Sequence, residues 1–115
     1  MPEPAVEMLR GTLDLLILRA LTRQSLHGYG VMRWIEDATG DVLQIEEGSL
    51  YPALYRLEDR GWIESDWGLS ENNRRARYYR LTIKGRAQLK TEVRDFTRFA
   101  KAVFRAIDQP EPAKA

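Results

Sequence analysis

The last quarter of this chain carries apolar side chains at alternating spacings of four and three residues. Such spacing predicts one long helix over 83–107, capped by Thr82, that presents a single apolar seam. About three heptads make the seam long for a helix that serves only the core of one small domain. The seam could pack within its own chain, or it could join two copies of the protein. We favour the second explanation. The seam consists of Leu89, Val93, Phe96, Ala100, Val103 and Ile107, widened by Phe99 and Phe104.

Size and composition describe one small globular domain. The 115 residues, 43% hydrophobic and 30% charged, fit a single core. The absence of cysteine excludes a disulfide framework, a thiol nucleophile and cysteine-ligated metals, and a single histidine excludes a histidine cluster. No catalytic constellation is present, so an enzyme is the weakest interpretation. We expect no cofactor and no metal.

The chain shows no targeting segment. The first residues, Met-Pro-Glu-Pro, lack the positive charge of a signal peptide, and the apolar stretch 13–21 is too short to span a bilayer. We therefore expect a cytoplasmic protein without a membrane segment. Residues 1–8 and 108–115 are rich in Pro, Ala and Glu, which predicts frayed ends.

Two helices are expected in the first forty residues. One runs from a Thr12 N-cap to about residue 22 and is apolar on most of its circumference. We therefore expect it to bury a second face, with Leu13, Leu16 and Ile17, against a partner subunit. The other helix covers 28–38 with one apolar stripe and ends at Gly40. Residues 42–45 are expected to form a short extended stretch.

The clearest helix covers 49–60. Ser49 is expected to cap it, and a proline is tolerable in its first turn. One face supplies a stripe of Leu and Ala to the core. The opposite face suits a contact surface better than a solvated one, because it carries two tyrosines, a proline and an arginine. These outward residues are Tyr51, Pro52, Tyr55, Arg56 and Asp59.

A hairpin with a basic tip follows. Residues 62–67 and 78–83 are rich in aromatic and β-branched side chains, and 68–75 hold turn-forming residues. The formal net charge of +1 conceals an asymmetry: residues 1–60 carry six basic and ten acidic side chains, whereas 61–115 carry twelve and seven. Seven basic residues and no carboxylate lie between residues 72 and 91. Such a block is either a solvated charged face or the electrostatic footprint of a polyanion.

The order of the elements favours the second alternative. Helix, helix, short strand, helix and basic hairpin is the order of a winged helix-turn-helix, whose third helix enters the major groove while the wing contacts the neighbouring backbone. We therefore predict a mainly α fold with a small β-hairpin, in which 9–82 form the DNA-binding domain and 83–107 the dimerisation helix. The predicted DNA contacts are Ser49, Tyr51, Pro52, Tyr55 and Arg56 on the third helix and Asn72, Asn73, Arg74, Arg75 and Arg77 on the wing.

The start of the second helix offers a further contact. His27 stands before Gly28 and Tyr29, and we expect it to cap or pack the helix, with a contact to the DNA backbone as the functional alternative. A catalytic or pH-sensing role is disfavoured, because no nucleophile motif accompanies this histidine.

Several stretches carry the pattern of a known family. They are Arg10–Leu18, His27–Tyr29, Glu47–Leu57, Arg60–Ile63, Arg74–Thr82 and Gly85. These stretches closely resemble the PadR-type transcriptional regulators over about residues 9–91, and the string Gly-Ser-Leu-Tyr-Pro-Ala-Leu is the most specific. The resemblance implies a homodimeric repressor that binds double-stranded DNA at an inverted repeat, with 49–60 as recognition helix, 72–77 as wing, and the first and last helices as the dimer interface. In some members a small aromatic or cationic molecule binds at that interface.

The predicted dimer interface combines residues of both terminal helices: Leu13, Leu16, Ile17, Leu89, Val93, Phe96, Phe99, Ala100, Val103 and Ile107. Three tryptophans, Trp34, Trp62 and Trp67, are expected in the core or an interface. The rival interpretation is a winged-helix module that binds protein and not DNA. An acidic or apolar third-helix face would favour it, and the tyrosines and Arg56 argue against it.

Overall fold

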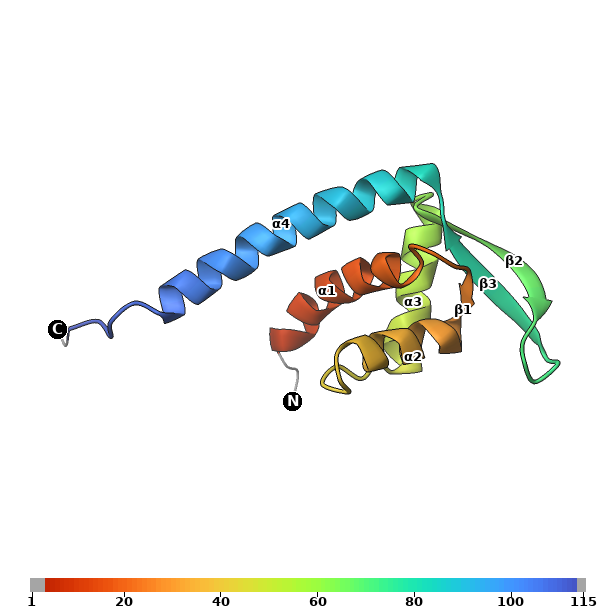
Figure 1. Ribbon diagram of the computed structural model, residues 1–115, viewed down its shortest axis with the longest axis horizontal. Coiled ribbons are helices and arrows are strands. Elements are labelled where there is room, and N and C mark those ends of the chain that lie inside the picture. The colour runs from red at the N-terminus through yellow and green to blue at the C-terminus, as the bar shows by residue number, and fades with distance from the viewer. Residues whose placement is uncertain (1–3, 114–115) are drawn as a thin grey trace.

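Four helices and a small antiparallel sheet form the molecule (Figure 1). The computed structural model describes the backbone of residues 4–113 and the side chains of 11–113. The elements are α1 (Pro4–Ala20), β1 (Leu26–His27), α2 (Gly28–Ala38), α3 (Glu47–Asp59), β2 (Ile63–Leu69), β3 (Arg75–Leu81) and α4 (Ile83–Ile107). The predicted fold class, mainly α with a β-hairpin, is confirmed.

The first helix begins earlier than predicted. It starts at Pro4, so Thr12 lies in its interior and the prediction of Thr12 as an N-cap is wrong. Residues 4–8, which were expected to fray, belong to this helix, and residues 1–3 lie outside the described part. Proline is tolerated in a first turn, and most of the residues after it are good helix formers, which explains the earlier start.

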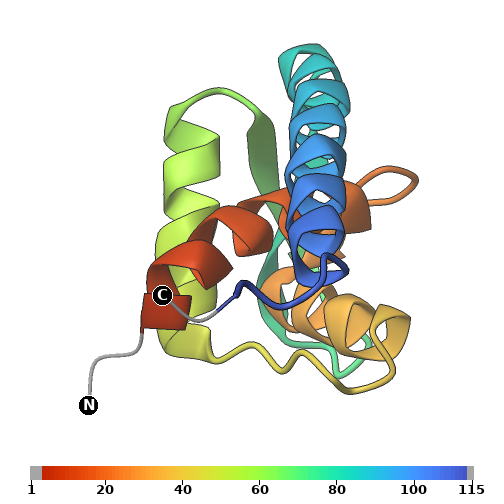
Figure 2. The ribbon, with the colours of Figure 1, turned by 90° about the vertical axis from the view of Figure 1, so that its left-hand side faces the viewer.

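One core gathers around α1, which packs against α2, α3 and α4; Figure 2 shows α1 passing between α3 and α4. Leu13 and Ile17 are buried inside the single chain, so the expectation that they face a partner subunit is wrong. Three helices surround α1, which accounts for its apolar circumference without a partner. Leu16 is half-buried and packs against the same core.

The third helix begins at Glu47, with Glu46 in the N-cap position. The prediction that Ser49 caps it is therefore wrong: Ser49 lies in the first turn and its N–H donates to the Glu46 carbonyl at 3.0 Å. An acidic residue in the first turn suits the positive end of the helix dipole, which accounts for the start at Glu47. Pro52 lies in the second turn and is exposed.

The sheet has three strands in the order β1-β3-β2. β3 pairs with β2 along seven residues, and β1 adds two residues on its other side, Leu26 opposite Tyr79 and His27 opposite Tyr78. The extended stretch predicted at 42–45 forms no strand; the short strand is β1. Gly40, with a φ of 58°, ends α2 as predicted.

The last helix leaves the body and gives the molecule a length of 63 Å (Figure 1). The Thr82 hydroxyl accepts a hydrogen bond from the Gly85 N–H at 2.9 Å, so the predicted cap is confirmed. Leu89 packs in the core of its own chain, where the start of α4 contacts α1, so the expectation that it faces a partner subunit is wrong. From residue 93 onward the apolar seam is uncovered: Val93, Phe96, Phe99, Val103 and Ile107 are 39–68% exposed, and Ala100 is half-buried.

Candidate nucleic-acid interface

The outward face of α3 carries uncovered tyrosines. Leu50, Ala53, Leu54 and Leu57 fix the opposite face in the core. That packing leaves Tyr51 47% and Tyr55 73% exposed, with Ser49 and Pro52 exposed beside them. Large aromatic side chains on a helix that is otherwise well buried suit a contact surface, because rings can lie against sugars and bases while hydroxyls bond to phosphates.

Arg56 is directed differently from the tyrosines. Its Nη2 lies 2.7 Å from Oδ1 of Asp14 on α1, and both side chains are largely shielded from solvent. A charge-assisted bond of this length between partly buried groups holds the guanidinium on the body of the protein. Arg56 therefore joins α3 to α1 in this structure.

A tight turn forms the tip of the hairpin. The Ser70 N–H donates to the Arg74 carbonyl, and the Asn73 N–H donates to the Ser70 carbonyl, each at 2.8 Å. Asn73 has a φ of 59°, a left-handed conformation that asparagine tolerates well. Asn72, Asn73 and Arg74 are exposed there. The two strands reach closer to the tip than predicted, because this turn needs only residues 70–74.

Cross-strand carboxylates neutralise part of the basic block. Arg80 Nη1 lies 2.7 Å from Asp66 Oδ2, and Arg80 Nε lies 3.0 Å from Glu64 Oε1. These two carboxylates raise the pKa of Arg80, the hydrogen bond to Asp66 contributing most. The positive charge of Arg80 is therefore compensated within the sheet.

Arg77 is tied to the third helix. Its Nε donates to Ser65 Oγ at 2.7 Å, and its Nη2 lies 3.5 Å from Glu58 Oε2. Ser65 in turn donates to Glu58 at 2.6 Å, so the three side chains form one network. By contrast, no described carboxylate lies within ion-pairing distance of Arg74 or Arg75, whose charges remain available to an anion.

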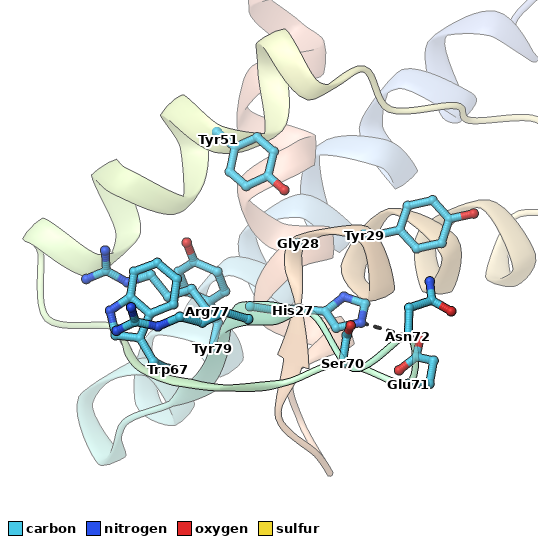
Figure 3. A pocket seen from close by; sticks show the side chains of 12 residues that line it. His27, Gly28, Tyr29, Tyr51, Trp67, Ser70, Glu71, Asn72, Arg77 and Tyr79 are labelled. Carbon is cyan, nitrogen blue, oxygen red and sulfur yellow. Dashed lines mark ion pairs between the residues drawn. The ribbon is translucent and has the colours of Figure 1, made fainter.

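A hollow of about 460 Å³ lies between the start of α2, the start of α3 and the hairpin (Figure 3). It brings together predicted residues from three separate segments: His27, Gly28 and Tyr29, Tyr51, and Asn72, Arg75 and Arg77. The remaining predicted contacts, Ser49, Pro52, Tyr55, Arg56, Asn73 and Arg74, lie outside its lining. The hollow thus has aromatic walls and an arginine edge, a lining suited to a nucleic-acid backbone.

His27 connects the hairpin tip with α2. Its Nδ1 accepts a hydrogen bond from the Gly30 N–H at 2.9 Å, which caps α2 as predicted. Its Nε2 lies 3.5 Å from Oε1 of Glu71 at the tip. The pKa of Glu71 is lowered mainly by a hydrogen bond to its own backbone and further by His27.

Gly28 is required by a close approach. A Cβ at this position would overlap the Tyr51 hydroxyl at 2.6 Å, so the ring of Tyr51 can rest on α2 only where no side chain intervenes. The beginnings of α2 and α3 are thereby held together beneath the hollow.

The hollow also contains residues that were not predicted as site residues: Trp67, Ser70, Glu71, Ala76 and Tyr79. Trp67 is 58% exposed on β2 and therefore lies outside the core. The period-two alternation of a strand could have found it, because Trp67 shares a face with Ser65 and lies opposite Arg77.

A second hollow, of about 270 Å³, lies between α1 and α4 beside the uncovered seam. Gly11, Thr12, Leu15, Phe96 and Phe99 line it together with Glu92 and Asp95. No group of side chains suited to metal binding occurs among the described residues. Across residues 4–113, no helix combines the length and apolar content needed to cross a bilayer.

Comparison with known proteins gives consistent matches. The family described as "Transcriptional regulator PadR-like family" matches residues 17–91. Protein X of Lysinibacillus sphaericus, an uncharacterized protein, is 33% identical over 90 residues, which cover 78% of this chain and 83% of that protein. A transcriptional regulator from Clostridium thermocellum is 31% identical with a TM-score of 0.78, covering 90% of this chain and 99% of its own. A PadR family regulator from Eggerthella lenta is 28% identical with a TM-score of 0.76, covering 92% and 90%.

Proposed function

Since the chain belongs to the PadR-like family of transcriptional regulators, we propose that it is a sequence-specific DNA-binding repressor that acts in the cytoplasm as a homodimer on an inverted-repeat operator. One observation carries this proposal: the hollow that brings Tyr51 of α3 together with Arg75 of the wing, which has no carboxylate partner among the described residues. A winged helix binds DNA with these two elements.

The two elements have different tasks in this proposal. The recognition helix α3 enters the major groove, where Tyr51 and Tyr55 contact base edges, thymine methyl groups and sugars. Arg74 and Arg75 on the wing bind phosphates, which fix the orientation of the protein and contribute affinity for any sequence. Arg56, held by Asp14, supports the recognition helix from behind.

The apolar seam of α4 supports the homodimer. Isolated apolar side chains on a surface need no explanation, whereas a continuous row of valine, phenylalanine and isoleucine along one helix face indicates an interface. A second copy of α4 would cover this row by knobs-into-holes packing. In a two-fold dimer the recognition helices then meet half-sites about 34–36 Å apart, or a multiple of it.

The ligand suggested by the resemblance is a further expectation. The hollow between α1 and α4 borders the seam and combines Phe96 and Phe99 with the carboxylates of Glu92 and Asp95. Aromatic faces and negative charges suit an aromatic cation. In this proposal such a molecule would bind at the dimer interface and release the operator.

Selection of bound duplexes from a random pool tests the proposal. We expect recovery of an inverted repeat, to which the protein binds at least a hundredfold more tightly than to random DNA at physiological salt. Tyr55→Ala should reduce this ratio without unfolding the protein, because Tyr55 is exposed. Equal binding to selected and random duplexes would contradict sequence-specific recognition and favour a protein-binding module.

A further inference from the structure

The indole ring of Trp67 on β2 contacts two arginines of the neighbouring strand β3. The Arg75 guanidinium carbon is 4.5 Å from the ring centroid, and that of Arg77 is 5.7 Å away. We propose that Trp67 is a positioning residue, which holds Arg75 in place to bind a phosphate of duplex DNA. The inference rests on the proposed function, because it assumes that the wing meets DNA.

The ring itself is held from the recognition helix. Arg77, against the ring, is bonded to Ser65 and paired with Glu58 of α3. A continuous series of contacts thus runs from α3 through Arg77 and Trp67 to Arg75. These contacts fix the position of Arg75 relative to α3, the helix that reads the bases in the proposed function. Figure 3 shows Trp67 and Arg77 side by side at the edge of the hollow.

Stacking differs from ion pairing in what it leaves for a ligand. The carboxylates around Arg80 and Arg77 occupy N–H donors and cancel charge. An aromatic face attracts a guanidinium through its quadrupole, yet leaves the N–H groups at the rim of the plane free and the full charge in place. Arg75 is therefore oriented, charged and without a carboxylate partner among the described residues.

The exposure of Trp67 supports the same assignment. A 58% exposed tryptophan at a hairpin contributes little to the core. The ring nevertheless faces the hollow that contains Tyr51 of α3. An arginine held in advance loses less side-chain entropy when it binds a phosphate, which strengthens binding to any duplex. We therefore expect the Trp67–Arg75 pair to increase the affinity for any duplex, without increasing the discrimination between sequences.

A double-mutant cycle on the full chain tests the proposal. The variants are Arg75→Ala, Trp67→Leu and the double variant, with Trp67→Phe to retain an aromatic face. Binding to a short fluorescent duplex of random sequence is measured by anisotropy at several salt concentrations. Arg86→Ala provides the matched control, because Arg86 is an exposed arginine of the same basic block that lies outside the hairpin.

We expect Arg75→Ala to weaken binding about tenfold and to lower the salt slope by about one. Trp67→Leu should weaken binding about threefold, Trp67→Phe less, and Trp67→Leu should have no further effect once Arg75 is alanine. In the Arg86→Ala background, Trp67→Leu should cost its full threefold. In the free protein, the Arg75 side-chain protons should show an upfield NMR shift that disappears in Trp67→Leu.

Two results would overturn the inference and leave DNA binding intact: a free protein without this ring-current shift, or an equal effect of Trp67→Leu with and without Arg75. The second result would mean that Trp67 acts independently of Arg75. If the unmodified protein bound neither selected nor random duplexes, the proposed function would fail and this inference with it. The three results are distinguished by the NMR spectrum and by the binding of the unmodified chain.

Discussion

Arg56 connects α3 with α1 through an ion pair that is largely shielded from water. Replacement by methionine retains the aliphatic stem and leaves the Asp14 carboxylate without this bond. We expect the free energy of unfolding to fall by about 2 kcal/mol, less than for a fully buried pair, because water reaches part of the guanidinium. Urea denaturation measures the change.

Arg94→Met serves as the control for this prediction. Arg94 is exposed, and its Nε lies 3.5 Å from Oδ1 of the neighbouring Asp95. Loss of this exposed pair should change the free energy of unfolding by less than about 0.5 kcal/mol. Equal stability of the Arg56→Met and Arg94→Met variants would show that the bond to Asp14 does not stabilise the fold.

The burial of Tyr79 is expected to lower the stability of the folded protein at alkaline pH. Its burial raises the pKa of the phenol above the ordinary value of 10.0, because the buried site disfavours the phenolate. The folded state favours the neutral phenol. The contribution of Tyr79 to the free energy of unfolding is therefore complete below pH 10.0 and is lost as pH rises through the pKa of the folded state. We expect urea denaturation to show falling stability in this range, with a weaker dependence in Tyr79→Phe. An unchanged pH dependence in that variant would contradict the assignment.

At the scale of elements, the junction of the sheet and α4 depends on Gly85. A Cβ on Gly85 would overlap the backbone carbonyl of Trp62, which cannot rotate away as a side chain can. Gly85→Ala should therefore shift the start of α4 and destabilise the protein by about 2–3 kcal/mol. Thermal denaturation followed by circular dichroism measures the loss.

Gly48→Ala provides the comparison on another helix. A Cβ on Gly48 meets no atom within 4 Å. Alanine is the better helix former, so this variant should gain up to about 1 kcal/mol. A Gly85→Ala variant as stable as Gly48→Ala would show that the carbonyl contact at the junction can relax at no cost.

For the whole molecule, the length of 63 Å arises from a helix that extends past its own core. Phe96→Asp places a charge in the middle of the uncovered seam, and we expect it to convert dimers into monomers at micromolar concentration, because the charge would be buried without a partner. Light scattering after size exclusion measures the mass. Arg98→Asp, on the opposite side of the same helix, should remain dimeric; equal masses of both variants would refute the seam as the interface.

Much of this architecture follows from local patterns in the chain. The stripe of Leu50, Ala53, Leu54 and Leu57 and the heptad spacing of the last helix depend only on the helical period, so both helices were predicted correctly in kind. The hairpin was predicted too, although its observed strands extend two or three residues closer to the tip than the predicted ones. The two-residue β1 escaped prediction because so short a strand has no period to detect.

The sequence by itself determined the order of the four helices and the hairpin, the seam and the placement of basic residues on the wing, because these depend on neighbours in the chain. Only the tertiary structure decided which charges remain available. Asp14 reaches Arg56 from α1, Glu58 reaches Arg77 from α3, and the strand pairing covers Arg80. The tertiary structure also places Leu13 and Ile17 in the core of one chain. Electrostatic and apolar partners are chosen by distance in space, which no local pattern contains.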